Sequence, residues 1–243
     1  MYEITVKIAE HCVVLNAIHP QALFTCLPYK VTCPAEFVVK STVEEIDAER
    51  DAMAALDPDR VMVDSVIEST VLLRKVADRM LDYDTILLHG AVIAVDDAAY
   101  LFSAKSGTGK TTHIFKWLTG IPGAYVLNGD KPLIITGENP RACGTPWCGQ
   151  ERMSCNKIVP LKAIVFMERS EDNKIRPMNS LEAFPLLLGQ THRPEDSDKM
   201  KKTVHLLTSL LKSVSFYKFH FNNFRDDCLD VAYETLVGGN CKK

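Results

Sequence analysis

The chain has 243 residues, of which 47% are hydrophobic and 24% are charged, and its formal net charge is −3 at pH 7. These values are ordinary for a globular protein that buries one substantial core, with or without a smaller unit attached. No apolar run is long enough to cross a membrane and no basic run offers a groove for nucleic acid, so we expect neither as a partner.

The N-terminal part, residues 1–82, is expected to form a small α+β unit packed on the rest of the chain. Alternating apolar and polar residues predict strands over residues 2–9, 12–16 and 37–40. The first of these has the pattern of a strand and not of a secretory signal. We therefore expect a cytoplasmic protein.

The eight cysteines include no C-x₂-C pair, so no zinc-ribbon spacing is present. Free thiols are expected in a reducing cytosol. Cys143 and Cys148 flank residues 144–147, and no chemical role is expected for either.

Two helices are expected in the N-terminal unit, each from a capping-box spacing. Thr42 and Glu45 have the spacing in which two residues cap the helix start reciprocally, and they begin a helix that runs toward Leu56. Ser65 and Glu68 repeat this spacing ahead of a helix over residues 66–81. The apolar residues of this second helix recur at helical spacing, so we expect it to pack in the core.

Residues 83–243 are expected to form the second, larger unit. The β-prone run over residues 85–95 predicts one long strand, and Asp96 and Asp97 then turn the chain into a strand over residues 99–103. Further strands are expected over residues 124–128, 132–136, 141–144, 161–167 and 214–221, and helices over residues 111–118, 181–188, 196–212 and 224–236.

A phosphate-binding loop is the strongest functional signal in the chain. Residues 104–111 follow the pattern G-x-x-x-x-G-K-S/T, with Ala104 in place of the first glycine. Small residues let backbone N–H groups converge on phosphate oxygens, while the lysine reaches the β- and γ-phosphates and the threonine hydroxyl ligates Mg²⁺. We expect ATP and Mg²⁺ as cofactors, with GTP left open. The nucleotide-binding residues expected are Ser106, Gly107, Thr108, Gly109, Lys110, Thr111 and Thr112.

Two further residues are candidates for the chemistry. Asp130 follows the predicted strand over residues 124–128 and would hold Mg²⁺ together with Thr111. The alternative is an aspartate that only supports a turn. His89 lies in an otherwise apolar predicted strand, where the alternative is an ordinary core histidine.

The order of these features resembles that of HPr kinase/phosphorylase. A His-Gly pair, an apolar hairpin, the phosphate loop and an apolar strand ending in aspartate follow one another, and the fifteen-residue step from His89 to Ala104 fits that family. The chain also resembles a group of small bacterial proteins related both to HPr kinase and to phosphoenolpyruvate carboxykinase. The resemblance rests on residues 81–84, 88–90, 104–112, 130–133, 144–147, 160–164 and 193–194. It implies an α/β fold with a P-loop nucleotide-binding core of this type over residues 83–243.

The resemblance also implies a reaction, the transfer of the γ-phosphoryl group of ATP to a hydroxyl such as a serine of a protein, a peptide or a small molecule. Carried over by position, Lys110 would neutralise the phosphates, Thr111 and Asp130 would hold Mg²⁺, and His89 would orient the phosphates or the acidic pair. Arg193 would contact the acceptor or the transferring phosphoryl group, with a plain surface arginine as the alternative. HPr kinases assemble into hexamers, which leaves a homo-oligomer open.

Gly129 departs from the resembled families, in which two adjacent aspartates end this strand. One carboxylate anchors the metal and the other can accept the proton of the attacking hydroxyl, a role that contributes about 10²–10⁴-fold in rate. Two hypotheses follow: an ATP-dependent hydroxyl kinase in which the remaining groups suffice, and a nucleotide-binding regulator with impaired catalysis. A true carboxykinase is disfavoured, because the chain is less than half the usual size of one and lacks a counterpart of its oxaloacetate-binding residues.

Overall fold

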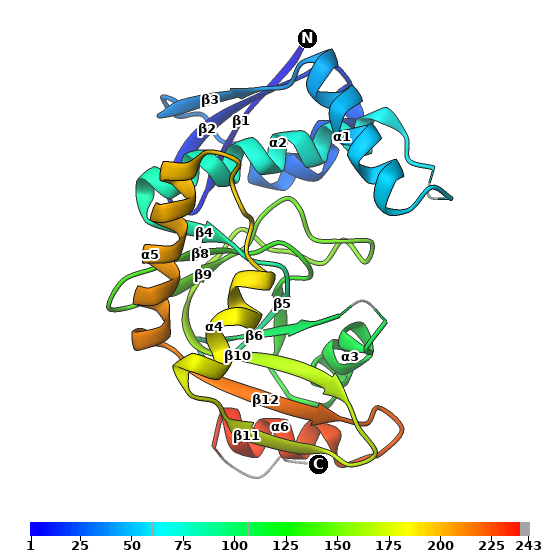
Figure 1. Ribbon diagram of the computed structural model, residues 1–243, viewed down its shortest axis with the longest axis vertical. Helices are drawn as coiled ribbons and strands as arrows, with labels where there is room; N and C mark the ends of the chain where they lie inside the picture. The colour runs from blue at the N-terminus through cyan, green and yellow to red at the C-terminus, as the bar shows by residue number, and fades with distance from the viewer. Residues whose placement is uncertain (60, 106, 239–243) are drawn as a thin grey trace.

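The computed structural model describes residues 1–59, 61–105 and 107–238. The protein is a mixed α/β protein with a small N-terminal three-stranded sheet and a larger mixed sheet (Figure 1). The small sheet lies at the top of this view, near the N-terminus, and the C-terminal helix lies at the bottom. Within the described residues, no helix combines the length and the apolar character needed to span a membrane.

The small sheet confirms the three strands expected at the N-terminus. Strands β1 (Tyr2–Ile8) and β2 (His11–Ala17) pair antiparallel, and β3 (Phe37–Lys40) adds to β2 in parallel. The chain reaches β3 through a 3₁₀ segment, Pro20–Tyr29, which the sequence pattern did not predict.

The two N-terminal helices begin differently. Helix α1 (Val43–Leu56) has the predicted capping box, because Thr42 accepts a hydrogen bond from the Glu45 N–H and the Glu45 side chain accepts one from the Thr42 N–H. Helix α2 (Asp64–Met80) does not, so the second predicted capping box is wrong. The carboxylate of Glu68 is instead buried and accepts hydrogen bonds from neighbouring segments of the chain.

The larger sheet has the strand order β4-β8-β9-β10-β6-β5-β7, with β12 beside β10 and β11 beside β12. Its strands are β4 (Thr85–Leu87), β5 (Ala91–Val95), β6 (Ala98–Ala104), β7 (Tyr125–Asn128), β8 (Leu133–Ile135), β9 (Arg141–Cys143), β10 (Ile158–Arg169), β11 (Lys174–Pro177) and β12 (Ser215–Phe221). All of the strands predicted beyond residue 98 are present, and β11 is an additional one.

The single strand expected over residues 85–95 is the main correction in this sheet. The run is divided, so that β4 pairs with β8 whereas β5 pairs with β6 and β7. Between them, the N–H groups of Leu88, His89 and Gly90 donate to carbonyls of two other segments, at Pro132, Gln190 and Asp130 respectively. His89 therefore lies in a break between strands and not within one.

Helices cover both faces of the larger sheet. Helices α4 (Ser180–Gly189) and α5 (Ser197–Ser213) pack on one face, and α3 (Lys110–Gly120) and α6 (Cys228–Leu236) on the other. A third apolar cluster joins the small sheet and α2 to residues of the larger sheet. The N-terminal unit is thus packed on the core, while its division from the core at residues 82 and 83 stays a prediction.

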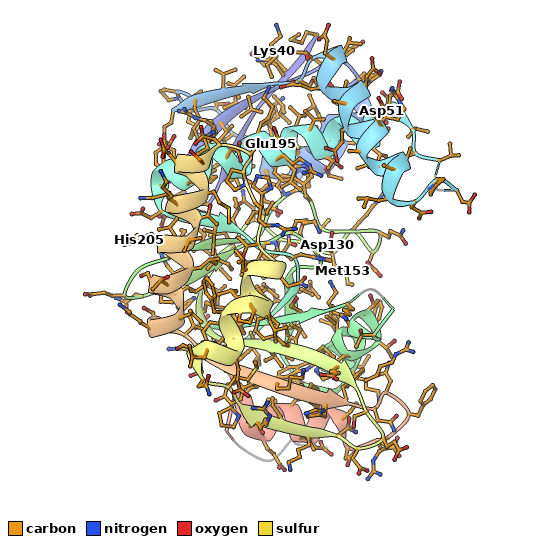
Figure 2. The ribbon with its side chains drawn as sticks, viewed as in Figure 1. Lys40, Asp51, Asp130, Met153, Glu195 and His205 are labelled. Atoms are coloured by element: carbon orange, nitrogen blue, oxygen red, sulfur yellow. A yellow bond between two sulfur atoms is a disulfide. The ribbon has the colours of Figure 1, made fainter. Side chains whose placement is uncertain are left out.

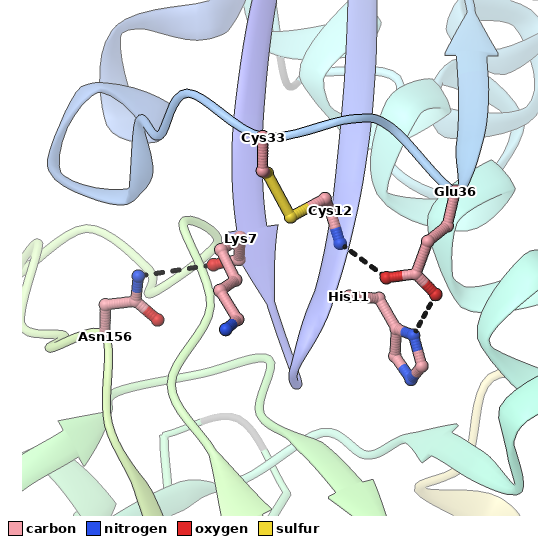
Figure 3. The surroundings of a disulfide bond; sticks show 6 residues. All are labelled: Lys7, His11, Cys12, Cys33, Glu36 and Asn156. Carbon is pink, nitrogen blue, oxygen red and sulfur yellow. Dashed lines mark hydrogen bonds and ion pairs between the residues drawn. A yellow bond between two sulfur atoms is a disulfide. The ribbon is translucent and has the colours of Figure 1, made fainter.

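A disulfide joins Cys12 and Cys33, so the expectation of free thiols is wrong for these two residues (Figure 3). The chain between β2 and β3 folds back and brings Cys33 against the start of β2. There, Glu36 accepts hydrogen bonds from the Cys12 N–H and the His11 ring. Cys26, Cys143, Cys148, Cys155 and Cys228 are free, and Cys241 lies outside the described residues. Burial raises the pKa of the Cys143 thiol to about 12.

Candidate functional site

The strand directions bring the candidate residues to one edge of the larger sheet. Strand β10 runs parallel to β6 and to β12, and β5 runs antiparallel to both β6 and β7. The carboxyl ends of β6, β7, β10 and β12 therefore lie at the same edge, where β5 begins. Ligands of α/β sheets bind outside such an edge. The phosphate loop follows β6, Asp130 follows β7, and His89 precedes β5.

The phosphate loop connects β6 to the N-terminus of α3, as predicted. Gly107 has φ +76° and Gly109 has φ +108°, conformations that favour glycine. Ala104 is the last, extended residue of β6, so its position does not require glycine. Thr108 closes the loop, because its N–H and its hydroxyl both donate to the Lys105 carbonyl. The predicted contact residue Ser106 lies outside the described residues.

Neighbouring strands support this loop from their carboxyl ends. The Arg169 guanidinium, at the end of β10, donates to the Gly107 carbonyl. A Cβ atom at Gly109 would lie 3.0 Å from Asn223 Nδ2 and 3.1 Å from Phe221 Cε1, so a side chain there would be crowded as well as strained. Arg169 and Asn223 were not predicted from the sequence, because only the sheet order reveals that these residues meet the loop.

Asp130 is the centre of a cluster of basic side chains. Its Oδ1 lies 3.1 Å from His89 Nε2 and 3.8 Å from Lys110 Nζ, and its Oδ2 lies 3.2 Å from Lys131 Nζ. Burial alone would raise the pKa of the Asp130 carboxyl. The hydrogen bond with His89 and the charges of Lys131, His89 and Lys110 outweigh that effect and hold the pKa well below its usual range. The carboxylate is therefore ionised at neutral pH.

The buried side chain of Asn128 fixes the turn that presents Asp130. Its Oδ1 accepts hydrogen bonds from the N–H groups of Asp130 (2.9 Å) and Lys131 (2.7 Å), and its Nδ2 donates to the carbonyl and hydroxyl of Thr145. The Gly90 N–H then donates to the Asp130 carbonyl and brings His89 alongside. Asn128 was not predicted from the sequence, because its position depends on contacts with the distant Thr145.

Gly129 is enclosed by the segment of residues 148–153. Its N–H donates to the Met153 carbonyl, and Figure 2 shows Asp130 and Met153 close together. A Cβ at Gly129 would lie 2.7 Å from the Cys148 carbonyl oxygen. An aspartate could not occupy this position unless the backbone of the segment shifted. Gly129 is thus required by the packing here.

The same segment carries a second carboxylate, that of Glu151. The Thr111 hydroxyl donates to Glu151 Oε1 at 3.1 Å. A Cβ at Gly149 would lie 3.1 Å from Asp130 Cβ and 3.6 Å from Glu151 Oε2, so both acidic residues border the same space. Glu151 was missed, since it stands twenty-one residues from Asp130 and in no recognised motif.

The donor set at this edge fits Mg²⁺. Within the described residues no group of three or more His, Cys, Asp or Glu side chains is placed to hold a metal ion. Mg²⁺ does not need such a cage, because it binds one or two carboxylates together with phosphate oxygens and water. Oxygen atoms of Thr111, Glu151 and Asp130 are available here.

The remaining predicted residues lie on two sides of this cluster. Arg193 lines a cleft together with His89 and Lys131, away from the phosphate loop. Thr112 is exposed in the first turn of α3. The structure thus brings together Lys110, Asp130 and His89, with Thr111 contacting Glu151.

Comparison of the chain with protein-family models gave no match, and neither did comparison with curated proteins. Among solved structures, the chain is similar to the Hpr(Ser) kinase/phosphatase from Coxiella burnetii. The two share 12% identity with a TM-score of 0.36, over 62% of this chain and 87% of the other. These values establish neither a shared family nor a shared reaction, so the proposals below rest on contacts within this chain.

Proposed function

We propose that the protein binds ATP with Mg²⁺ and transfers the γ-phosphoryl group to the hydroxyl of an acceptor. The observation that carries this proposal is the convergence of the phosphate loop, Lys110, Asp130 and His89 at one edge of the sheet. Under it, residues 83–243 act as a P-loop core of the HPr kinase type. A packing role would explain neither the loop glycines nor a half-buried lysine facing an aspartate.

Each group has a role that its position supports. Backbone N–H groups of the loop and the N-terminus of α3 would hold the phosphates with Lys110. Thr111 and Asp130 would hold Mg²⁺, which neutralises negative charge on the β- and γ-phosphates when bound. His89, in contact with Asp130 Oδ1, would orient that carboxylate.

Glu151 supplies the second carboxylate under this proposal. The acceptor oxygen forms a bond to the γ-phosphorus, the bond from that phosphorus to the bridging oxygen breaks, and ADP leaves with the electron pair. The hydroxyl proton passes to the Glu151 carboxylate, which is exposed and can return it to water. Asp130 is less suited to this step because the side chains of Lys110, Lys131 and His89 already contact its carboxylate.

A nucleotide-binding regulator is the second candidate function. It is favoured by Gly129, whose enclosure by Cys148 leaves no room for the paired aspartate. In that case ATP would bind and stabilise the protein without turnover.

Incubation with Mg²⁺ and ATP labelled at the γ-phosphate separates the two functions. The acceptors would be free serine, serine peptides and small hydroxy compounds, with ADP release measured in parallel. A kinase labels at least one acceptor over many turnovers. Lys110→Ala should abolish labelling, whereas Lys162→Ala, an exposed lysine on β10, should behave as the wild type. ATP binding without labelled product or ADP would favour the regulator.

A further inference from the structure

A cleft of about 310 Å³ adjoins the phosphoryl-transfer site on the side of the N-terminal unit. Helix α2 contributes Arg74 to one wall, and residues 189–193 form the other. Backbone hydrogen bonds fix that second wall, from the His89 N–H to the Gln190 carbonyl (2.7 Å) and from the His192 N–H to the Leu87 carbonyl (3.0 Å). The cleft is therefore part of the folded framework.

The cleft is lined by cationic side chains. Arg74, Lys131 and Arg193 line it with His89 and His192, and no aspartate or glutamate is among the described lining residues. Carboxylates outside the lining neutralise several of these groups, since Glu49 pairs with Arg74, Asp78 with His192, and Asp130 with both Lys131 and His89. Arg193 is exposed at the cleft. Such a lining favours an anionic ligand.

The cleft also holds unused hydrogen-bonding capacity. Gln190, a lining residue, has its Oε1 atom buried without a hydrogen-bond partner in the described part of the chain. Buried polar atoms are usually satisfied, so an orphan at a cleft wall indicates a missing donor.

Two lining residues connect the cleft to the phosphoryl-transfer site. His89 Nε2 and Lys131 Nζ both contact the Asp130 carboxylate, at 3.1 and 3.2 Å. A ligand in the cleft would therefore be separated from Asp130 by one side chain. The volume suits a small molecule, because small-molecule sites begin at about 300 Å³.

We propose that this cleft binds the phosphoryl acceptor, and that the acceptor is a small hydroxy compound with a carboxylate or phosphate group held by Arg193 and Arg74. This inference rests on the proposed function, since it assigns the acceptor of the same site. The anionic group would lie between the two arginines, and the hydroxyl would extend past His89 toward the space that Asp130 and Glu151 both border.

Three probes with one carbon skeleton test the proposal by calorimetric titration: glycerate, glycerol 3-phosphate and glycerol. The protein is first loaded with the non-hydrolysable analogue AMP-PNP and Mg²⁺, which blocks the phosphate loop. Glycerate or glycerol 3-phosphate should bind at least tenfold more tightly than glycerol, and the tighter of the two identifies the anionic group. Equal affinity of all three would overturn the proposal.

Variants locate the binding. Arg193→Gln should weaken the tighter probe about tenfold and leave AMP-PNP affinity unchanged. Arg141→Gln removes an arginine that pairs with Glu10 and is not among the described lining residues of the cleft, so it should change neither affinity. An unaltered probe affinity in Arg193→Gln would overturn the assignment.

The two proposals fail separately. Glycerate is also titrated without nucleotide, so that the cleft is tested even if AMP-PNP does not bind. If AMP-PNP does not bind the wild-type protein but glycerate does, only the proposed function is contradicted. If AMP-PNP binds and the anionic probes are not preferred over glycerol, only the proposed acceptor class is contradicted.

Discussion

Two acidic residues, Glu68 and Asp130, are held in opposite ways. Glu68 is fully buried, and its oxygens accept hydrogen bonds from the N–H groups of Ile18 (2.6 Å) and His19 (2.9 Å), the His19 ring and the Ser41 hydroxyl. The Asp130 side chain is 28% exposed, and its partners are the basic side chains of Lys110, Lys131 and His89.

The comparison separates a carboxylate that joins segments of the fold from one that we propose acts in ligand binding. The donors around Glu68 are mostly uncharged, and all of them are hydrogen-bonded to its carboxylate. The Glu68 carboxylate therefore joins segments of the chain, and these donors are not free for a ligand. Lys110 and Lys131 lie beside Asp130 with several N–H donors each, which an anion such as a triphosphate can use. Substitutions at the first residue should therefore change stability, and substitutions around the second should change binding and turnover.

Glu68→Ala should have the largest effect on stability. Removal of the carboxylate leaves the buried donors of Ile18, His19 and Ser41 unpaired, at a cost of about 3–5 kcal/mol. Denaturant unfolding measures this loss, and Glu44→Ala, an exposed glutamate on α1, is the control. A loss within the error of the control would contradict the structural role.

Glu151→Gln should lower turnover about 10²-fold, or about 2.7 kcal/mol in activation free energy, because the amide cannot accept the proton. Glutamine keeps an oxygen for the Thr111 hydroxyl, so AMP-PNP affinity should change little. Glu138→Gln, an exposed glutamate in the turn between β8 and β9, serves as the control. Wild-type turnover in Glu151→Gln would show that this carboxylate takes no part in the reaction.

Gly129→Ala should destabilise the protein by about 1–3 kcal/mol, the usual cost of overpacking. The added Cβ would lie 2.7 Å from the Cys148 carbonyl oxygen. Gly189→Ala is a matched control, because a Cβ there meets nothing within 4 Å. Equal melting temperatures for the two variants would contradict this prediction, because they would show that the backbone of residues 148–153 shifts without loss of stability.

The pH dependence of Glu68 should be the smallest effect. Burial alone would raise the pKa of this carboxyl, but hydrogen bonds from Ser41, Ile18 and His19 lower it below 4.5. The unfolded chain therefore binds the proton more tightly, and the contribution of Glu68 is complete above about pH 4.5 and is lost as the pH falls below that value. The stability difference between the wild type and Glu68→Gln should shrink over this acidic range. A difference that stays constant down to pH 3 would contradict the shift.

Local patterns were sufficient to predict the strand, loop and helix around Lys110, and the aspartate that follows β7. These features depend on residues adjacent in the chain, where periodicity and glycine positions are informative. The break at His89 was not predictable, because an apolar run reads as one strand whether or not its two halves pair with different partners.

Contacts between distant segments were also beyond prediction. Glu151 contacts Thr111 only because the segment after β9 folds over Gly129. Glu68 accepts hydrogen bonds from donors some fifty residues away and therefore does not form the predicted capping box. The disulfide between Cys12 and Cys33 likewise depends on the path of an unpredicted 3₁₀ segment. In each case a residue type was visible in the sequence, and its partner was set by tertiary packing.

Thermal unfolding in the presence of AMP-PNP, with and without Mg²⁺, probes the site around Lys110 and Asp130 most directly. At a hundredfold excess of AMP-PNP over its dissociation constant, we expect the wild type to be stabilised by about 2.7 kcal/mol. The affinity should be higher with Mg²⁺ than without it. Lys110→Ala should not be stabilised by AMP-PNP under either condition. An unchanged melting temperature in the wild type, or equal stabilisation of Lys110→Ala, would contradict nucleotide binding at this edge of the sheet.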